Sequence, residues 1–243
     1  MRVGVICEGP TDFLAISTFF AVALEGEGID IDFVAVQPPG DKTNGDGGWG
    51  NVLLWIKKNP LRTREKRYFG SGLFGGGLSE EQFDALLFHL DADVLGEESF
   101  VNYVKSELGY SVLQPSPDQP SEKAAEIRRV LGVACEFDSM TTTDQNKHVP
   151  APAVETTETW CIASVEKKAG LYEELTGVEL TNKFMQVLEK SEGRGGAGEY
   201  SKINKSVRRR KRFCDNQMSS AYRIASHCPQ FSAICDQLKT LAD

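Results

Sequence analysis

The first part of the chain alternates between short apolar runs and longer amphipathic stretches. Residues 2–7 and 84–90 are largely apolar, a pattern that is typical of strands buried on both faces of a parallel sheet. Residues 29–36 alternate and are rich in β-branched side chains, which predicts another strand. Residues 10–24 begin with a proline and a threonine, which favours a helix start. The chain is therefore expected to open with a β–α–β unit and a right-handed crossover.

Further elements complete the predicted sheet and its helical cover. Helices are expected at residues 49–58, 98–108 and 121–131, and a fourth strand at residues 110–114. This alternation of strands and helices predicts an α/β fold with a mainly parallel sheet flanked by helices. Residues 62–77 hold basic side chains followed by glycines, and we expect a long loop there.

The pattern changes near residue 138. Residues 141–152 are polar and contain prolines, which predicts a loop. Helices are expected at residues 155–168, 183–190 and 221–241, so the second part of the chain is predicted to be mainly helical.

Charge is distributed unevenly along the chain. We expect residues 1–135 to form an α/β core, and residues 136–243 to complete it and add a helical, basic C-terminal region within one compact unit. The 243 residues carry a net charge of −8, yet residues 201–243 carry nine basic and three acidic side chains. This asymmetry favours a polyanionic partner. A solvated basic helix face is the alternative.

Composition excludes several other classes of protein. The longest apolar stretch, residues 13–24, is about half as long as a bilayer-spanning helix must be. No basic segment precedes it, so we expect neither a signal peptide nor a membrane anchor. The six cysteines form no CxxC pair, which disfavours zinc and iron–sulfur sites. Together these features indicate a protein of the reducing cytoplasm.

Two acidic motifs follow two of the predicted strands. Glu8 comes directly after the first strand, and Asp91 and Asp93 come directly after the strand at residues 84–90. Ligands of open parallel sheets bind beyond the carboxyl ends of the strands, so these carboxylates are expected to converge if the two strands are neighbours. Mg²⁺ and Mn²⁺ prefer such oxygen ligands. A metal held there could polarise a phosphate and activate water, which points to phosphodiester chemistry.

Neighbouring residues fit a supporting role. Gly9 permits a tight turn after Glu8, and Asp12 is expected to cap the following helix or to orient a metal ligand. His89 lies inside a predicted strand and is expected to be a hydrogen-bonded interior histidine rather than a base. The alternative for both acidic motifs is that they only flank or cap helices.

The sequence around these motifs resembles a known family. Residues 5–12 are similar to the glutamate motif of Toprim domains, especially those of nucleases related to the overcoming-lysogenization-defect proteins, and residues 90–93 resemble the Toprim DxD motif. Residues 158–163, 200–202 and 221–231 look like segments of an uncharacterised family of small stand-alone Toprim-like proteins. The resemblance implies a Toprim-like, Rossmann-like fold and metal-dependent cleavage of phosphodiester bonds.

The resemblance also implies roles for individual residues. Glu8, Asp91 and Asp93 become metal ligands and catalytic residues, with Glu8 also a potential acid or base. Glu158 becomes a fourth carboxylate for the metal, and Lys202 a phosphate contact. Related nucleases often work with a partner ATPase in defence against bacteriophage. This chain departs from the family where the shorter Asp12 stands in place of a glutamate.

The basic C-terminal region supplies candidate contacts for nucleic acid. Side chains of this kind can follow a phosphate backbone, which makes affinity fall steeply with salt. The candidates are Lys202, Lys205, Arg208, Arg209 and Arg210.

The main hypothesis is therefore a Mg²⁺- or Mn²⁺-dependent nuclease that acts on DNA in preference to RNA. One alternative is a non-catalytic Toprim-like subunit that regulates a partner or binds nucleic acid. Another is a nucleotide-sugar glycosyltransferase that uses Asp91 and Asp93 as its metal motif. The sequence leaves open the number of metal ions and whether the protein forms a homo-oligomer.

Overall fold

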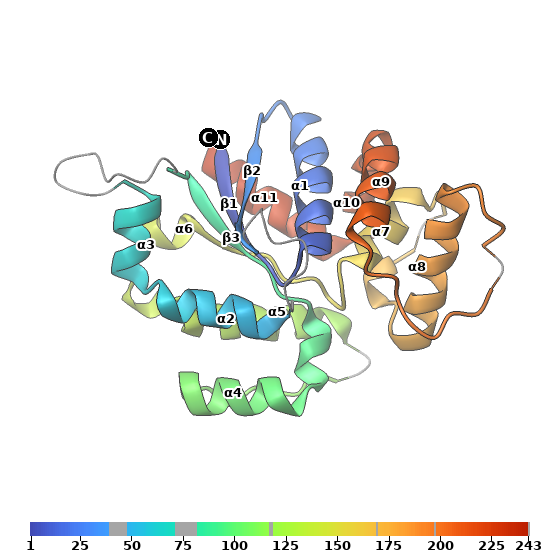
Figure 1. Ribbon diagram of the computed structural model, residues 1–243. Coiled ribbons are helices and arrows are strands. Elements are labelled where there is room, and N and C mark those ends of the chain that lie inside the picture. Colours follow the sequence, from blue (N-terminus) through green and yellow to red (C-terminus); the bar gives the residue numbers. More distant parts are fainter. Residues whose placement is uncertain (39–47, 71–81, 117–118, 169, 197, 243) are drawn as a thin grey trace.

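The computed structural model describes residues 1–38, 48–70, 82–116, 119–168, 170–196 and 198–242. At its centre lies a four-stranded parallel sheet in the order β2-β1-β3-β4 (Figure 1). The strands are β1 (Arg2–Ile6), β2 (Asp32–Gln37), β3 (Ala85–Phe88) and β4 (His148–Pro150). The predicted α/β class, with a parallel sheet and flanking helices, is confirmed.

Helices cover both faces of the sheet. Alternate residues of a strand point to opposite faces, so Val5 and Leu87 join one apolar cluster while Ile6 and Phe88 join the other. The first cluster is covered by α1 (Pro10–Glu25), α10 (Tyr222–His227) and α11 (Pro229–Ala242). The second is covered by α2 (Trp49–Lys58), α4 (Glu98–Leu108) and α5 (Pro120–Ala134), on the opposite side of the sheet in Figure 1.

The fourth strand is not where the sequence predicted it. Residues 110–114 form no strand; instead the Glu126 carboxylate accepts hydrogen bonds from the Tyr110 hydroxyl at 3.0 Å and from the Leu113 amide at 2.8 Å. The fourth strand is β4, which pairs with β3 inside the stretch predicted to be a loop. β4 is only three residues long and ends in Pro150, and proline is tolerated in an edge strand.

The predicted loop at residues 62–77 is also corrected. Its first part belongs to helix α3 (Leu61–Tyr68), while residues 71–77 lie outside the described part of the chain. Arg64 of α3 is fully buried and donates hydrogen bonds to the Asn59 and Cys135 carbonyl oxygens and to His148 Nε2. These tertiary contacts hold the helix in place, and they cannot be read from local composition.

The second part of the chain is mainly helical, as predicted. It contains α6 (Thr142–Asn146), α7 (Glu158–Val165), α8 (Gly177–Ser191), α9 (Val207–Gln217), α10 and α11. The helix expected at residues 221–241 is divided where α11 begins, because Pro229 has no amide proton to continue the preceding helix. Within the described ranges, every helix is too short or too polar to cross a bilayer.

Candidate functional site

The two acidic motifs meet at the carboxyl edge of the sheet. β1 and β3 are parallel neighbours in which Ile6 pairs with Phe88, so the residues that follow them emerge side by side. The Asp91 amide donates a hydrogen bond of 2.9 Å to Glu8 Oε1. The structure thus brings together two motifs that are 83 positions apart in the sequence, as the parallel-sheet argument predicted.

Asp12 reaches the same place from the first turn of α1. Its Oδ1 accepts a hydrogen bond of 2.9 Å from the Thr157 hydroxyl. The Thr157 amide in turn donates to Asp91 Oδ1 at 3.2 Å. Thr157 immediately precedes α7 and is fully buried, so one residue fixes the orientation of two carboxylates. This supporting role for Thr157 was not predicted, since nothing local in the sequence indicates it.

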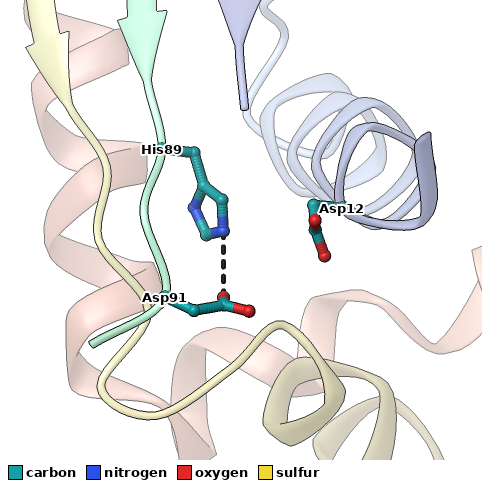
Figure 2. A group of neighbouring side chains, drawn as sticks. All are labelled: Asp12, His89 and Asp91. Carbon is teal, nitrogen blue, oxygen red and sulfur yellow. Dashed lines mark hydrogen bonds and ion pairs between the residues drawn. The ribbon is translucent and has the colours of Figure 1, made fainter. Parts of the chain in front are cut away.

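His89 is the third polar side chain of this group. Its Nδ1 lies 2.7 Å from the Ala151 carbonyl oxygen, and its Nε2 lies 3.1 Å from Asp91 Oδ1. Figure 2 shows His89 and Asp91 leaving the end of β3 and Asp12 facing them from α1. One potential ligand atom from each residue lies within 4.8 Å of those of the other two. The expected hydrogen bond of an interior histidine is present at Nδ1, but the proximity of Nε2 to the carboxylates was not predicted.

A cleft of about 540 Å³ opens over the two aspartates of this group, whereas His89 is fully buried beneath them and is not part of the lining. Glu8, Asp12, Asp91 and Asp93 line it, and Lys205 approaches from the segment before α9. The rest of the lining comes from Gly9, Pro10, Thr11, Gly48, Trp49, Val94, Glu97 and Val207. Gly9 begins the turn into α1, since its carbonyl oxygen accepts hydrogen bonds from the Asp12 and Phe13 amides. Among the described residues, the charged side chains that line the cleft are acidic except for Lys205.

The electrostatics of the cleft disfavour several negative charges at once. Burial raises the pKa of Glu8 to about 9, and the neighbouring Asp91 and Asp12 carboxylates add to the effect. Burial also raises the pKa of Asp91 well above its usual range, and that of Asp93 to about 6. Lys205 opposes the shift at both aspartates. Crowded, desolvated carboxylates of this kind are stabilised in their charged form by a cation.

Glu158 lies near this group, since its charge helps to raise the pKa of Asp91 and Asp93, but it is not a free carboxylate. Its role as a fourth metal ligand stays a prediction. Glu158 is 2% exposed and forms an ion pair with Arg210, which is 1% exposed. Burial alone would raise the pKa of Glu158, but the attraction of Arg210 and hydrogen bonds outweigh burial and the pKa is lowered. Glu158 therefore has its own counter-ion, and Arg210 donates to its Oε1.

The predicted nucleic-acid contacts separate into two groups. The predicted role of Arg210 as a nucleic-acid contact is wrong. Its guanidinium is buried over the Phe184 ring at 4.9 Å and cannot follow a phosphate backbone. Arg209 is half-buried and pairs with Glu189 and Glu192 of the α8 region. The other three side chains remain accessible to a ligand: Lys202, Lys205 and Arg208.

Lys205 is the basic residue most closely tied to the cleft. Burial lowers its pKa, but the carboxylates of Glu158, Asp12, Asp91 and Glu8 outweigh burial, and the pKa is raised. Its ammonium group is therefore charged at neutral pH and faces the acidic group.

Comparison with known proteins identifies no relative: no protein-family model, no curated protein and no solved structure matches this chain.

Proposed function

We propose that this protein is a divalent-metal-dependent phosphodiesterase with a Toprim-like fold, and that it cleaves nucleic acid, with DNA as the first substrate to test. The observation that carries the proposal is the hydrogen bond between the Asp91 amide and Glu8 Oε1. It supports a single site built from a glutamate after one parallel strand and an Asp-x-Asp motif after the next. The expected ATPase partner and role in phage defence remain predictions of the sequence resemblance.

The donor set fits a hard divalent cation. Glu8, Asp91, Asp93 and Asp12 offer carboxylate oxygens to one cleft, and such oxygens are the ligands that Mg²⁺ and Mn²⁺ take. Burial raises the pKa of Glu8 and of Asp93, and neighbouring carboxylates add to both shifts, so a cation would stabilise the charged forms. When bound, the metal supplies Lewis acidity toward a phosphoryl oxygen and lowers the pKa of water.

The protein's own groups have separable tasks in this reaction. Glu8 and Asp91 would hold the cation, while Thr157 keeps Asp12 and Asp91 in fixed orientations. Lys205 faces the cleft as a charged ammonium and neutralises part of the charge of an incoming phosphodiester. The exposed Lys202 and Arg208 lie on either side of Lys205 in the sequence and extend positive charge along the substrate strand.

Plasmid nicking with Mn²⁺ or Mg²⁺ tests the proposal. We expect cleavage by the full chain, and a fall of more than about 100-fold in the rate for Asp91→Asn, because even the outer partners of metal ligands are worth about 10- to 100-fold. The matched control is Asp236→Asn, the same change on the exposed side of α11. Equal rates for the wild type and Asp91→Asn would reject the proposal. Metal binding without cleavage would instead favour the non-catalytic subunit.

A further inference from the structure

We infer that His89 supplies a nitrogen ligand to the metal held by Asp12 and Asp91, and that the site consequently prefers a first-row transition ion, such as Mn²⁺, to Mg²⁺. The inference rests on the proposed metal site and specifies its chemistry. Its evidence is the hydrogen bonding and confinement of the His89 ring, together with the spacing of the potential ligand atoms.

The hydrogen bond to Ala151 decides which ring nitrogen can bind a metal. A carbonyl oxygen only accepts hydrogen bonds, so Nδ1, 2.7 Å away, must carry the proton and donate it. In the neutral ring, the lone pair then belongs to Nε2. This is the usual arrangement in metal sites, where the second ring nitrogen of a ligating histidine donates to a carbonyl or carboxylate.

The surroundings of Nε2 call for a positive charge. Nε2 lies 3.1 Å from Asp91 Oδ1, and a lone pair and a carboxylate oxygen are both acceptors. Asp91 Oδ1 already accepts the Thr157 amide hydrogen bond, at 3.2 Å. Two acceptors at this separation require a proton or a cation between them. Asp12, whose Oδ1 accepts the Thr157 hydroxyl, offers a third potential ligand atom within 4.8 Å of the other two.

The spacing between His89 Nε2 and Asp91 Oδ1 is compatible with coordination of one metal. Two ligands that lie about 2.1 Å from one metal at a right angle are about 3.0 Å apart. The separation of His89 Nε2 from Asp91 Oδ1 is 3.1 Å. The ring is also confined, since His89 has no exposed surface and packs 5.7 Å from the Trp160 ring. His89 is therefore oriented before any ion arrives.

A nitrogen ligand changes the order of metal affinities. Mg²⁺ is bound through oxygen and keeps several waters, whereas imidazole suits first-row transition ions. Two carboxylates and one imidazole therefore favour a transition ion over Mg²⁺. Within that series the affinity is expected to rise from Mn²⁺ to Co²⁺ and Ni²⁺.

Pulsed electron paramagnetic resonance on Mn²⁺ bound to the full chain tests this inference directly. The wild type is expected to show electron–nuclear coupling to ¹⁴N, and protein labelled with ¹⁵N-histidine is expected to show the ¹⁵N pattern in its place. No variant is needed for this result, so a folding defect cannot obscure it. The coupling should be lost in His89→Gln and kept in His227→Gln. His227 is the last residue of α10 and packs against the Tyr172 ring, away from the carboxylates.

The outcomes separate this inference from the proposed nuclease. Nitrogen coupling without DNA cleavage upholds the ligand and rejects the nuclease. Cleavage by a Mn²⁺ complex without histidine coupling overturns the ligand and leaves the nuclease standing, and His89 is then only a hydrogen-bond partner of Asp91. Absence of Mn²⁺ binding, or equal affinity for Mg²⁺ and Mn²⁺ in calorimetry, overturns the inference.

Discussion

Two groups of buried carboxylates lie close together in this protein, and they differ in their counter-ions. Glu158 is paired with Arg210, and its pKa is lowered. Glu8, beside Asp91 and Asp12, has its pKa raised to about 9 by burial and by those neighbours. The first arrangement is complete within the fold. The second is a charge cluster that a bound cation would complete, so the comparison separates a paired carboxylate from the carboxylates that we propose as metal ligands.

Thr157 links the two groups. Its hydroxyl donates to Asp12 and lies 3.4 Å from Arg210 Nη1, and its amide donates to Asp91. Through Thr157, the ion pair therefore helps to hold Asp12 and Asp91 in position. Changes to the ion pair should act mainly on folding, and changes to the cleft carboxylates should act mainly on metal binding.

The largest expected effect is on folding, from Arg210→Met. It leaves the Glu158 charge buried without its partner, which costs about 3–5 kcal/mol of stability. Urea unfolding measures this loss. The matched control is Arg208→Met, an exposed neighbour on α9, which should change stability by less than about 0.5 kcal/mol. Combining Arg210→Met with Glu158→Gln should recover part of the loss, and a stable single variant would show that the ion pair does not matter.

The next effect is a pH dependence from Glu8. With its pKa raised to about 9, the folded state holds a proton that the unfolded state releases near pH 4.5. The metal-free protein should therefore lose stability as pH rises from neutral toward 9, by on the order of 1 kcal/mol per pH unit. Urea unfolding in the presence of a chelator measures the slope, and added Mn²⁺ should flatten it.

Glu8→Gln is the comparison that isolates this contribution. Burial also raises the pKa of Asp91, Cys7 and Cys228, so these groups add a slope of the same sign. The Gln variant keeps those groups and should show the smaller slope. Identical slopes in the wild type and the variant would mean that Glu8 is not the titrating group.

A smaller effect is expected from Thr157→Val. The change removes the hydroxyl that holds Asp12 but keeps the amide bond to Asp91. We expect a loss of about 1–3 kcal/mol in stability and of about tenfold in Mn²⁺ affinity. Thr157→Ser keeps the hydroxyl and should restore metal binding. If the Val variant binds Mn²⁺ as tightly as the wild type does, the hydrogen bond from Thr157 to Asp12 does not contribute to metal binding.

The last prediction concerns DNA binding and Lys205→Met, a change at the edge of the cleft. DNA affinity should fall, and its salt dependence should lose about one unit of slope. Fluorescence anisotropy over a salt series measures both. Lys202→Met provides the comparison outside the cleft lining, and equal slopes for Lys205→Met and the wild type would remove Lys205 from the substrate path.

How much of this could be predicted from the sequence depended on how local each feature is. The meeting of Glu8 and Asp91 followed from apolar runs and the geometry of parallel sheets. The strand at residues 148–150 could not be predicted, because it is three residues long in a polar stretch and exists only through pairing with β3. The same limit explains α3, whose buried Arg64 depends on partners far away in the chain.

The role of a charged side chain depends on what faces it in three dimensions. Arg208 and Arg210 are indistinguishable in a basic run, yet one is exposed and the other is buried against Glu158. His89 could have been found, because residues two apart in an extended chain lie on the same side. His89 and Asp91 have that spacing at a strand end.

The central claim is that one divalent cation is shared by the ends of β1 and β3. Calorimetric titration of Mn²⁺ into the wild type, Glu8→Gln, Asp91→Asn and the double variant tests it most directly. If both residues hold the same ion, each single change abolishes tight binding and the double variant loses little more, because the effects are not additive. Wild-type affinity in either single variant would contradict the claim.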